Sequence, residues 1–311
     1  MTSLITTIFG VFGYIFIGYF IKKSNIISNK IFKFFNFISF NFLLPIALIT
    51  NFWNIRIPEL ILYELMFSFF GAGIIVFILG FVISRKFFDH KTDDSALFGL
   101  GACFGNSVAF GIPLMYSILG PVKVMPYMIL VLFHGLIHFT YTTLIIESYR
   151  NRSLPGFKLV VKTILGLLKN IILFGMFIGF FLNASNIPMP NTLSIILIPI
   201  SKIALPAVLI SLGMTIGSFK IFHKVSHSII LTALKNFIFP LIAFIIAKYI
   251  FFMPHTLVVI ATMAAALPSG SQTYYFSYRY NSLQQTITSN IVLSTFISFF
   301  TLSFLIIIFG Y

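Results

Sequence analysis

The chain consists almost entirely of apolar runs, separated by short stretches that hold basic and turn residues. Runs of about 20 residues cross the hydrocarbon core of a bilayer as helices, because a helix satisfies its own backbone polar groups. Cutting the chain at charges and turn residues predicts ten spans, near residues 4–21, 31–53, 61–84, 95–119, 124–147, 161–183, 192–217, 225–251, 256–278 and 283–309. The pattern predicts an all-α polytopic membrane protein.

Composition supports this class and excludes others. Charged residues make up 8% of the chain, against about a quarter in soluble domains. The net charge of +14 would suit nucleic acid, but the cations lie in short loops and form no basic face. We therefore expect a lipid bilayer as partner and no nucleic acid. A single cysteine, Cys103, excludes an intrachain disulfide and a cysteine-based metal cluster, and we expect no metal or cofactor.

Basic residues alternate from loop to loop. They follow the first, third, fifth, seventh and ninth spans, at Lys22, Lys23, Lys30, Lys33, Arg85, Lys86, Lys91, Arg150, Arg152, Lys158, Lys162, Lys220, Lys224 and Arg279. The opposite loops hold little beyond Arg56, Lys123 and Lys248. Because Lys and Arg accumulate on the cytoplasmic side, we expect a multi-pass membrane protein with both termini outside. We expect the first span to be a membrane helix and not a signal peptide, since its lysines follow the apolar run.

An internal repeat relates the two halves of the chain. The segment "FIGYFIKKSNI" (Phe16–Ile26) matches "FIGFFLNASNI" (Phe177–Ile187) at an offset of 161, with seven of eleven positions identical. The same offset places Pro45 on Pro206. Each half has five predicted spans, and an odd number means that the second half enters the membrane upside down. We expect one transmembrane domain, 1–311, built from a 5+5 inverted repeat with boundaries 1–153 and 154–311.

The fourth span of each half contains helix breakers, "GNSVAFGIP" in one and "ALPSGSQ" in the other. Such backbone is tolerated inside a bilayer only where protein buries it or it lines a wet cavity. We expect two broken helices that cross at the midplane and aim their positive ends at one anion site. Pro113 and Pro268 would lie in the first turns of the second halves, because proline lacks the N–H left unpaired there. The alternative is that the glycines only permit close helix packing and the proline is a kink. The predicted substrate-binding residues are Gly105, Asn106, Ser107, Gly111, Pro113, Pro268, Ser269, Gly270, Ser271 and Gln272.

Ionisable side chains within spans are a second signal. Lys202 lies near the middle of the seventh span, and an intramembrane cation is by default a functional hypothesis. It would be the counter-charge of an anion, or else snorkel along its helix. His134 and His138 share a helix face and form either a proton relay or a packed neutral pair. Pro45 and Pro206 are expected to bend their helices as structural hinges at the rim of the cavity.

These segments resemble the auxin efflux carrier family of bacterial and plant transporters. The resemblance rests on the "GN…G-P" segment of the fourth span, the "LP" of the second and "LPSGSQTYYFSYRY" of the ninth, and it covers essentially the whole chain by span count and order. It implies ten helices in an inverted repeat with crossed broken helices, and transport of organic anions such as carboxylates. Carried over, Asn106, Gly111, Pro113 and Pro268 occupy the crossing motif of the family. "SGSQ" departs from the run, containing alanine or asparagine, that bacterial relatives often have there.

The same analogy predicts that the first, second, sixth and seventh spans form a panel against which the others move, and that the protein is a possible homodimer.

Taken together, these features predict a secondary transporter that moves a small organic anion by alternating access. No Asp lies in any predicted span, which disfavours antiport through a titrating acid. An anion channel and a sodium-coupled symporter remain alternatives, since breakers also build selectivity filters, and a non-transporting scaffold is a third. An enzyme is not expected, because no P-loop or HExxH motif is present. A serine protease at "PSGSQ" would leave the other breaker unexplained.

Overall fold

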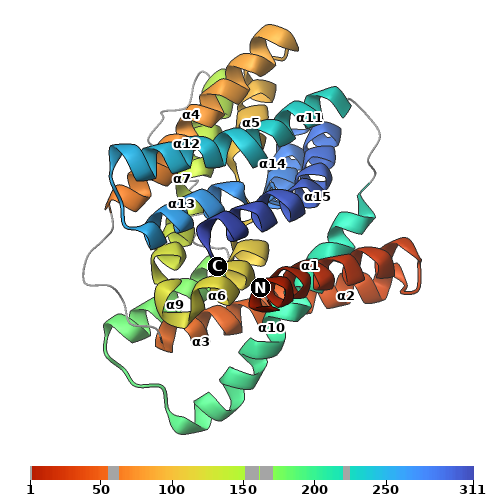
Figure 1. Ribbon diagram of the computed structural model, residues 1–311. Helices are drawn as coiled ribbons and strands as arrows, with labels where there is room; N and C mark the ends of the chain where they lie inside the picture. Colours follow the sequence, from red (N-terminus) through yellow and green to blue (C-terminus); the bar gives the residue numbers. More distant parts are fainter. Residues whose placement is uncertain (1, 55–62, 151–160, 162–170, 220–224) are drawn as a thin grey trace. The chain divides into compact units, whose positions relative to one another are not determined.

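The computed structural model describes residues 2–54, 63–150, 161, 171–219 and 225–311, and regular structure in these ranges is helical. The first half contains α1 (Thr2–Lys23), α2 (Asn29–Ile38), α3 (Leu44–Asn54), α4 (Tyr63–Phe87), α5 (Thr92–Cys103), α6 (Ile112–Lys123) and α7 (Met125–Arg150) (Figure 1). The second half contains α9 (Ile171–Ala184), α10 (Asn191–Ser218), α11 (Val225–Ala233), α12 (Phe239–Ile245), α13 (His255–Ala266), α14 (Gln272–Tyr280) and α15 (Gln284–Phe309).

Several of these helices suit a membrane. Among the described residues six are long and apolar enough to cross one: Asn29–Asn54, Tyr63–Phe87, Met125–Arg150, Asn191–Ser218, Ser226–Ile250 and Gln284–Phe309. Ser107–Lys123 and His255–Ala266 are apolar but shorter. The all-helical membrane class is therefore confirmed, while the ten spans and the repeat stay predictions. Part of the sixth predicted span, residues 162–170, lies outside the described residues.

Prolines are accommodated by locally widened turns. A π-helical stretch ends shortly before a proline in three places: Ser39–Leu43 before Pro45, Ser107–Gly111 before Pro113, and Leu234–Ile238 before Pro240. Proline lacks an N–H, and its ring clashes with the carbonyl four residues earlier in an α-helix. A wider turn shifts the bonding by one residue, as where the Leu44 N–H donates to the Ser39 carbonyl. The helix thus continues through the proline instead of ending there.

The chain divides into two compact units. Unit 1 is Met1–Ile61, Ile112–Met125 and Leu165–Ser218, and unit 2 is Leu62–Gly111, Pro126–Ile164 and Phe219–Tyr311. Unit 1 holds α1, α2, α3, α9 and α10, which come from the four spans expected to form a panel. It also holds α6, which the analogy had assigned to the other group. The broken fourth span therefore contributes to both units.

Within unit 1, helices pack in two close pairs, α1 on α10 and α3 on α9 (Figure 1). A Cβ atom added at Gly18 of α1 would overlap the carbonyl oxygen of Ile210 in α10. A Cβ added at Gly179 of α9 would lie 2.7 Å from the carbonyl oxygen of Ile49 in α3. Glycine thus brings the two backbones of each pair into contact. The offset of 161 residues places Gly18 on Gly179 and Ile49 on Ile210, so it interchanges the two contacts.

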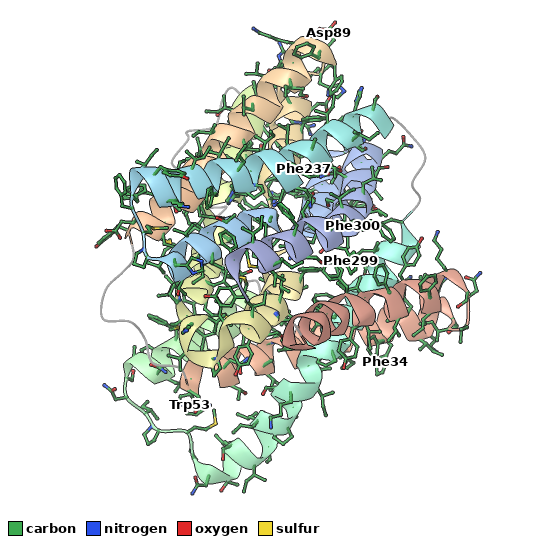
Figure 2. All side chains as sticks on the ribbon, viewed as in Figure 1. Phe34, Trp53, Asp89, Phe237, Phe299 and Phe300 are labelled. Atoms are coloured by element: carbon green, nitrogen blue, oxygen red, sulfur yellow. The ribbon has the colours of Figure 1, made fainter. Side chains whose placement is uncertain are left out.

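Hydrogen bonds complete these pairs. Ser211 donates to Asn36 Oδ1 at 3.0 Å, which ties α10 to α2. The Trp53 indole N–H donates to the carbonyl of Ile187 at 2.7 Å, and Asn183 Nδ2 donates to the carbonyl of Trp53 at 2.8 Å (Figure 2). These polar side chains of unit 1 therefore bond to one another or to nearby backbone, whereas the buried hydroxyl of Ser39 has no partner among the described residues.

Large apolar side chains also cover outer surfaces. Phe237 and Phe300 in unit 2 are exposed to 54% and 68%, and Phe34 in unit 1 is exposed to 66% (Figure 2). In a soluble domain such patches mark binding sites. On helices long enough to span a bilayer, they suit contact with lipid chains.

Candidate functional site

Both predicted helix breaks are present in unit 2. Helix α5 ends at Cys103, and helix α13 ends at Ala266. The helix resumes at Ser107 after the first break and at Gln272 after the second. These are interruptions of the helix and not simple kinks, so backbone carbonyls and N–H groups are freed on both sides.

The two extended segments pair with each other. Gly105 and Ser269 form an isolated antiparallel bridge. The Asn106 N–H donates to the Pro268 carbonyl at 2.8 Å, and in return the N–H of residue 270 donates to the carbonyl of residue 104 at 3.0 Å. Each break thus supplies hydrogen-bond partners to backbone groups of the other break that have no partner within a helix.

Neither proline has the position expected from the sequence. Pro268 lies between α13 and α14, four residues before α14 begins at Gln272. Pro113 follows the π-helical stretch Ser107–Gly111 and lies inside a helix that has already begun. The expectation that both occupy first turns was wrong. Pro268 ends the first half-helix because it cannot donate to the ladder of α13, and the widened turn carries Pro113 inside its helix.

Glycines at the breaks make room for aromatic rings. A Cβ atom added at Gly270 would lie 2.7 Å from the Phe104 ring, and one added at Gly111 would overlap the hydroxyl of Tyr127. That hydroxyl donates to the Ser107 carbonyl at 2.6 Å. Gly270 therefore lies in a helix break and also permits close packing, while Gly111 permits close packing within a helix, so the two roles that the sequence left as alternatives are both present.

Several buried polar atoms at the breaks have no hydrogen-bond partner in the described part of the chain. They include Asn106 Oδ1, Ser269 Oγ and Gln272 Oε1. Two imidazole nitrogens of α7 share this state, His134 Nε2 and His138 Nε2. Burying such groups without partners is unfavourable by about 1–3 kcal/mol each. A ligand at the breaks would supply hydrogen bonds that these atoms lack within the described part of the chain.

The two histidines face the crossing segments. The His134 ring lies 4.3 Å from the Phe104 ring between centroids, and its Nδ1 is 3.4 Å from Ser107 Oγ. His138 Nδ1 bonds to the His134 carbonyl at 2.8 Å. With exposures of 3% and 1%, the pair is part of the buried surroundings of the breaks. Its role as a relay or as a packed pair stays a prediction.

A buried lysine that the sequence analysis did not single out lies at the same place. Lys235, in the π-helical stretch Leu234–Ile238, has a relative exposure of 0%. Its Nζ donates to the carbonyl of Ala265 at 2.5 Å and lies 4.9 Å from the Phe239 ring centroid. The sequence does contain a signal for this residue. Lys235 lies near the middle of the predicted span 225–251, and an intramembrane cation is a functional hypothesis there, as it is at Lys202.

Lys202 has different surroundings, in unit 1. It is exposed and lines a cavity of about 380 Å³. The cavity is also lined by Gly10, Val11, Tyr14, Pro113, Ser117, Leu205, Pro206 and Leu209. The residues predicted to bind substrate are thus divided, with Pro113 and Lys202 in unit 1 and the others in unit 2. Pro45 is buried elsewhere in unit 1, with its carbonyl oxygen 3.0 Å from a Cβ added at Gly175.

Ser271 directly precedes α14, where its carbonyl accepts a hydrogen bond from the N–H of Tyr274 at 3.1 Å.

A family model described as membrane transport protein matches residues 3–306 of the chain. The chain belongs to the auxin efflux carrier family. The comparison with curated proteins gives no match. The members of this family are membrane transporters, which are generally not enzymes. The resemblance inferred from the short motifs is therefore confirmed.

A charged cluster in unit 2 joins elements on both sides of the breaks. Arg150, at the end of α7, donates to Asp93 Oδ2 at 2.6 Å and to the Tyr280 carbonyl at 2.9 Å. The Tyr280 hydroxyl donates to Glu147 Oε1 at 3.1 Å. The cluster joins the start of α5 to the ends of α7 and α14. The distribution of basic loops predicts that all three of these helix ends face the cytoplasm.

Proposed function

We propose that this protein is a secondary transporter that binds a small organic anion, of the carboxylate class, at the paired breaks and moves it by alternating access. The observation that carries the proposal is the group of buried, unpartnered polar atoms on Asn106, Ser269 and Gln272. Amide and hydroxyl groups donate as well as accept hydrogen bonds. The unpartnered amide oxygens of Asn106 and Gln272 only accept hydrogen bonds, so a carboxylate, which accepts up to about four, would take its bonds from the Ser269 hydroxyl and from the NH2 groups of the two amides once these have turned toward it.

The charges at the breaks favour an anion over a cation. No carboxylate lies in either break, whereas the buried ammonium of Lys235 bonds to the end of α13. In the described residues the ion pair is Arg150 with Asp93, so no paired carboxylate cancels the charge of Lys235. Hydrogen bonds to a charged ligand are roughly twice as strong as neutral ones. An anion is therefore the ligand that this surrounding stabilises.

Two features support alternating access. The inverted repeat is supported by the interchangeable contacts of Gly18 with Ile210 and of Gly179 with Ile49, and by the reciprocal hydrogen bonds between the breaks. The division into two compact units supports movement of one group of helices against another. The alternation of basic loops supports a multi-pass topology in a bacterial inner membrane with both termini outside. A homodimer belongs to the proposal by analogy alone.

The test is counterflow of labelled small carboxylates in proteoliposomes. We expect saturable exchange by the native protein and at least about tenfold less by Asn106→Ala, since a buried ligand loses a hydrogen bond to a charged group. Asn41→Ala is the matched control, because Asn41 Nδ2 bonds locally to the Phe37 carbonyl at 3.0 Å. We expect it to exchange at the native rate.

The outcomes separate the rival functions. Saturable exchange that survives unchanged in Asn106→Ala contradicts the proposed site. Anion current without countertransport indicates a channel, and exchange that requires a sodium gradient indicates a symporter. No exchange and no current across a broad carboxylate panel contradicts the proposed substrate class.

A further inference from the structure

The carbonyl end of α13 lacks its normal hydrogen-bond donors. The carbonyl of Ala264 would accept from residue 268 in a continued helix, but Pro268 has no N–H. The carbonyl of Ala265 would accept from the N–H of Ser269, which donates instead to Ser294 Oγ at 2.9 Å. The carbonyl oxygens of Ala264 and Ala265 are therefore among those left without a helical donor at the break, and together with the helix dipole they give this end a partial negative charge.

The ammonium of Lys235 lies at this end of α13. Its Nζ donates to the carbonyl of Ala265 at 2.5 Å. A Cβ atom added at Gly105 would lie 3.5 Å from Nζ and 3.6 Å from the carbonyl oxygen of Ala264, so both groups border the same point of the opposite break. The side chain is fully buried. The cation thus lies at the negative end of one half-helix and against the backbone of the other.

The other half-helix ends differently. At the end of α5 the carbonyl of Gly101 accepts from Asn290 Nδ2 at 3.1 Å. The amide oxygen of Asn290 accepts in turn from the Thr232 hydroxyl at 3.0 Å. A neutral amide thus bonds to one carbonyl at this end. Among the described residues, a lysine thus bonds to the end of α13 and a neutral amide to the end of α5. Hydrogen bonding alone therefore does not require a charge at such an end.

A buried charge without a counter-ion is expensive, and the structure compensates for it only in part. The Phe239 ring lies 4.9 Å from Nζ, and the Ala265 carbonyl supplies a dipole. Carbonyl groups that converge on a point are also the ligands of alkali and alkaline-earth cations. The ammonium stands where such a metal cation would bind, and its remaining charge is available to an anion.

We propose that Lys235 is a resident cation of the substrate site, which occupies the carbonyl end of α13 in place of a metal ion and supplies the positive charge paired with the transported anion. Transport then requires no co-transported metal cation. This inference rests on the proposed function in its statement about the anion. Its statement about the metal ion concerns the protein alone and is testable without a substrate.

The first experiment measures thermal unfolding of the full chain in detergent. Cys103 is the sole cysteine and is buried, so a thiol-reactive fluorophore reports unfolding. We compare the native protein, Lys235→Ala and Lys248→Ala in chloride salts of choline, sodium and methylammonium. Lys248 is a control from the same predicted span, because it is exposed and its Nζ lies 5.2 Å from the Phe244 ring centroid.

We expect the midpoints of the native protein and Lys248→Ala to be equal in the three salts. Lys235→Ala should unfold at a lower temperature in choline and recover in sodium or methylammonium, because a small cation enters the space beside the carbonyls. A sodium-dependent midpoint in the native protein overturns the inference. So does a Lys235→Ala variant whose midpoint none of the cations changes.

Two further variants keep the test informative should Lys235→Ala fail to fold. Lys235→Met retains most of the length without the charge, and Lys235→Gln retains a donor for the Ala265 carbonyl without the charge. Both should show the cation-dependent midpoint. If Lys235→Gln matches the native protein in stability and in counterflow, the residue is only a hydrogen-bond donor and the inference is wrong.

The second experiment measures carboxylate counterflow with sodium replaced by choline on both sides. We expect native exchange to be unchanged and Lys235→Gln to lose about tenfold or more, since it loses a charge-assisted bond to the anion. Native exchange that requires sodium overturns this inference and leaves the anion carrier intact. Absence of native exchange for every carboxylate overturns the proposed function, while the unfolding result still decides whether Lys235 replaces a metal ion.

Discussion

Two lysines, Lys202 and Lys235, lie near the middle of predicted spans, and the structure gives them opposite surroundings. Lys235 in unit 2 is fully buried and bonds to the carbonyl of Ala265. Lys202 in unit 1 is exposed and lines a cavity of about 380 Å³. The depth of a lysine along a span is therefore a poor guide to its role. The neighbouring helices decide whether its ammonium reaches water or helix carbonyls.

The two units differ in the same way beyond these lysines. In unit 1, Gly18 and Gly179 bring helix backbones into contact, and side chains such as Ser211 bond to a neighbouring helix. In unit 2, polar atoms such as Asn106 Oδ1 and Ser269 Oγ are buried without partners among the described residues. Unit 1 is thus built as a packed support. Unit 2 holds the buried groups to which we propose that a ligand bonds.

The largest effect expected from this contrast is on the stability of unit 1. Gly18→Ala forces a methyl group onto the carbonyl of Ile210, so α1 and α10 must separate. We expect a loss of up to about 3 kcal/mol in the free energy of unfolding, because backbone cannot move aside as a flexible side chain can. Thermal unfolding read at Cys103 measures it.

The control for this change is Gly13→Ala, also on α1, where an added Cβ meets nothing within 4 Å. We expect it to be neutral or slightly stabilising, as alanine favours helix over glycine by about 1 kcal/mol. Equal destabilisation by the two substitutions would contradict the backbone contact between α1 and α10.

An intermediate effect should separate the two lysines in transport. We expect Lys235→Ala to reduce carboxylate counterflow by about tenfold or more and Lys202→Ala by less than about threefold, because water already screens an exposed charge. The same proteoliposome preparation measures both variants. A loss in Lys202→Ala as large as that in Lys235→Ala means that Lys202 also supplies a counter-charge to the anion.

The smallest effect concerns the support of the first break. Tyr127→Phe removes the hydroxyl that donates to the carbonyl of Ser107 at 2.6 Å. We expect a loss of about 1–2 kcal/mol in the free energy of unfolding, since the buried carbonyl loses its partner. Counterflow should keep the native affinity for the anion. A changed affinity with unchanged stability would place the Tyr127 hydroxyl in the site itself.

Much of the architecture followed from local rules. Apolar runs of bilayer length predicted the helices, and the clusters around Gly105 and Ser269 predicted both breaks, because a helix cannot carry such residues through hydrocarbon at low cost. The positions of Pro113 and Pro268 were predicted wrongly. Pro113 follows a widened turn, and Pro268 follows the end of a half-helix. Local proline preferences do not distinguish these positions from a first turn, since none of them requires an N–H from the proline.

The sequence by itself determined that the chain is an all-helical membrane protein with two interrupted helices. The reason is that each segment in hydrocarbon must satisfy its own backbone hydrogen bonds, so its own residues decide whether it forms a continuous helix. Only the tertiary structure decided that the two breaks bond to each other and that Lys235, and not Lys202, is buried beside one of them. Burial and pairing depend on which surface another helix covers. Residues as far apart as Lys235 and Ala265 carry no sign of that contact in their own segments.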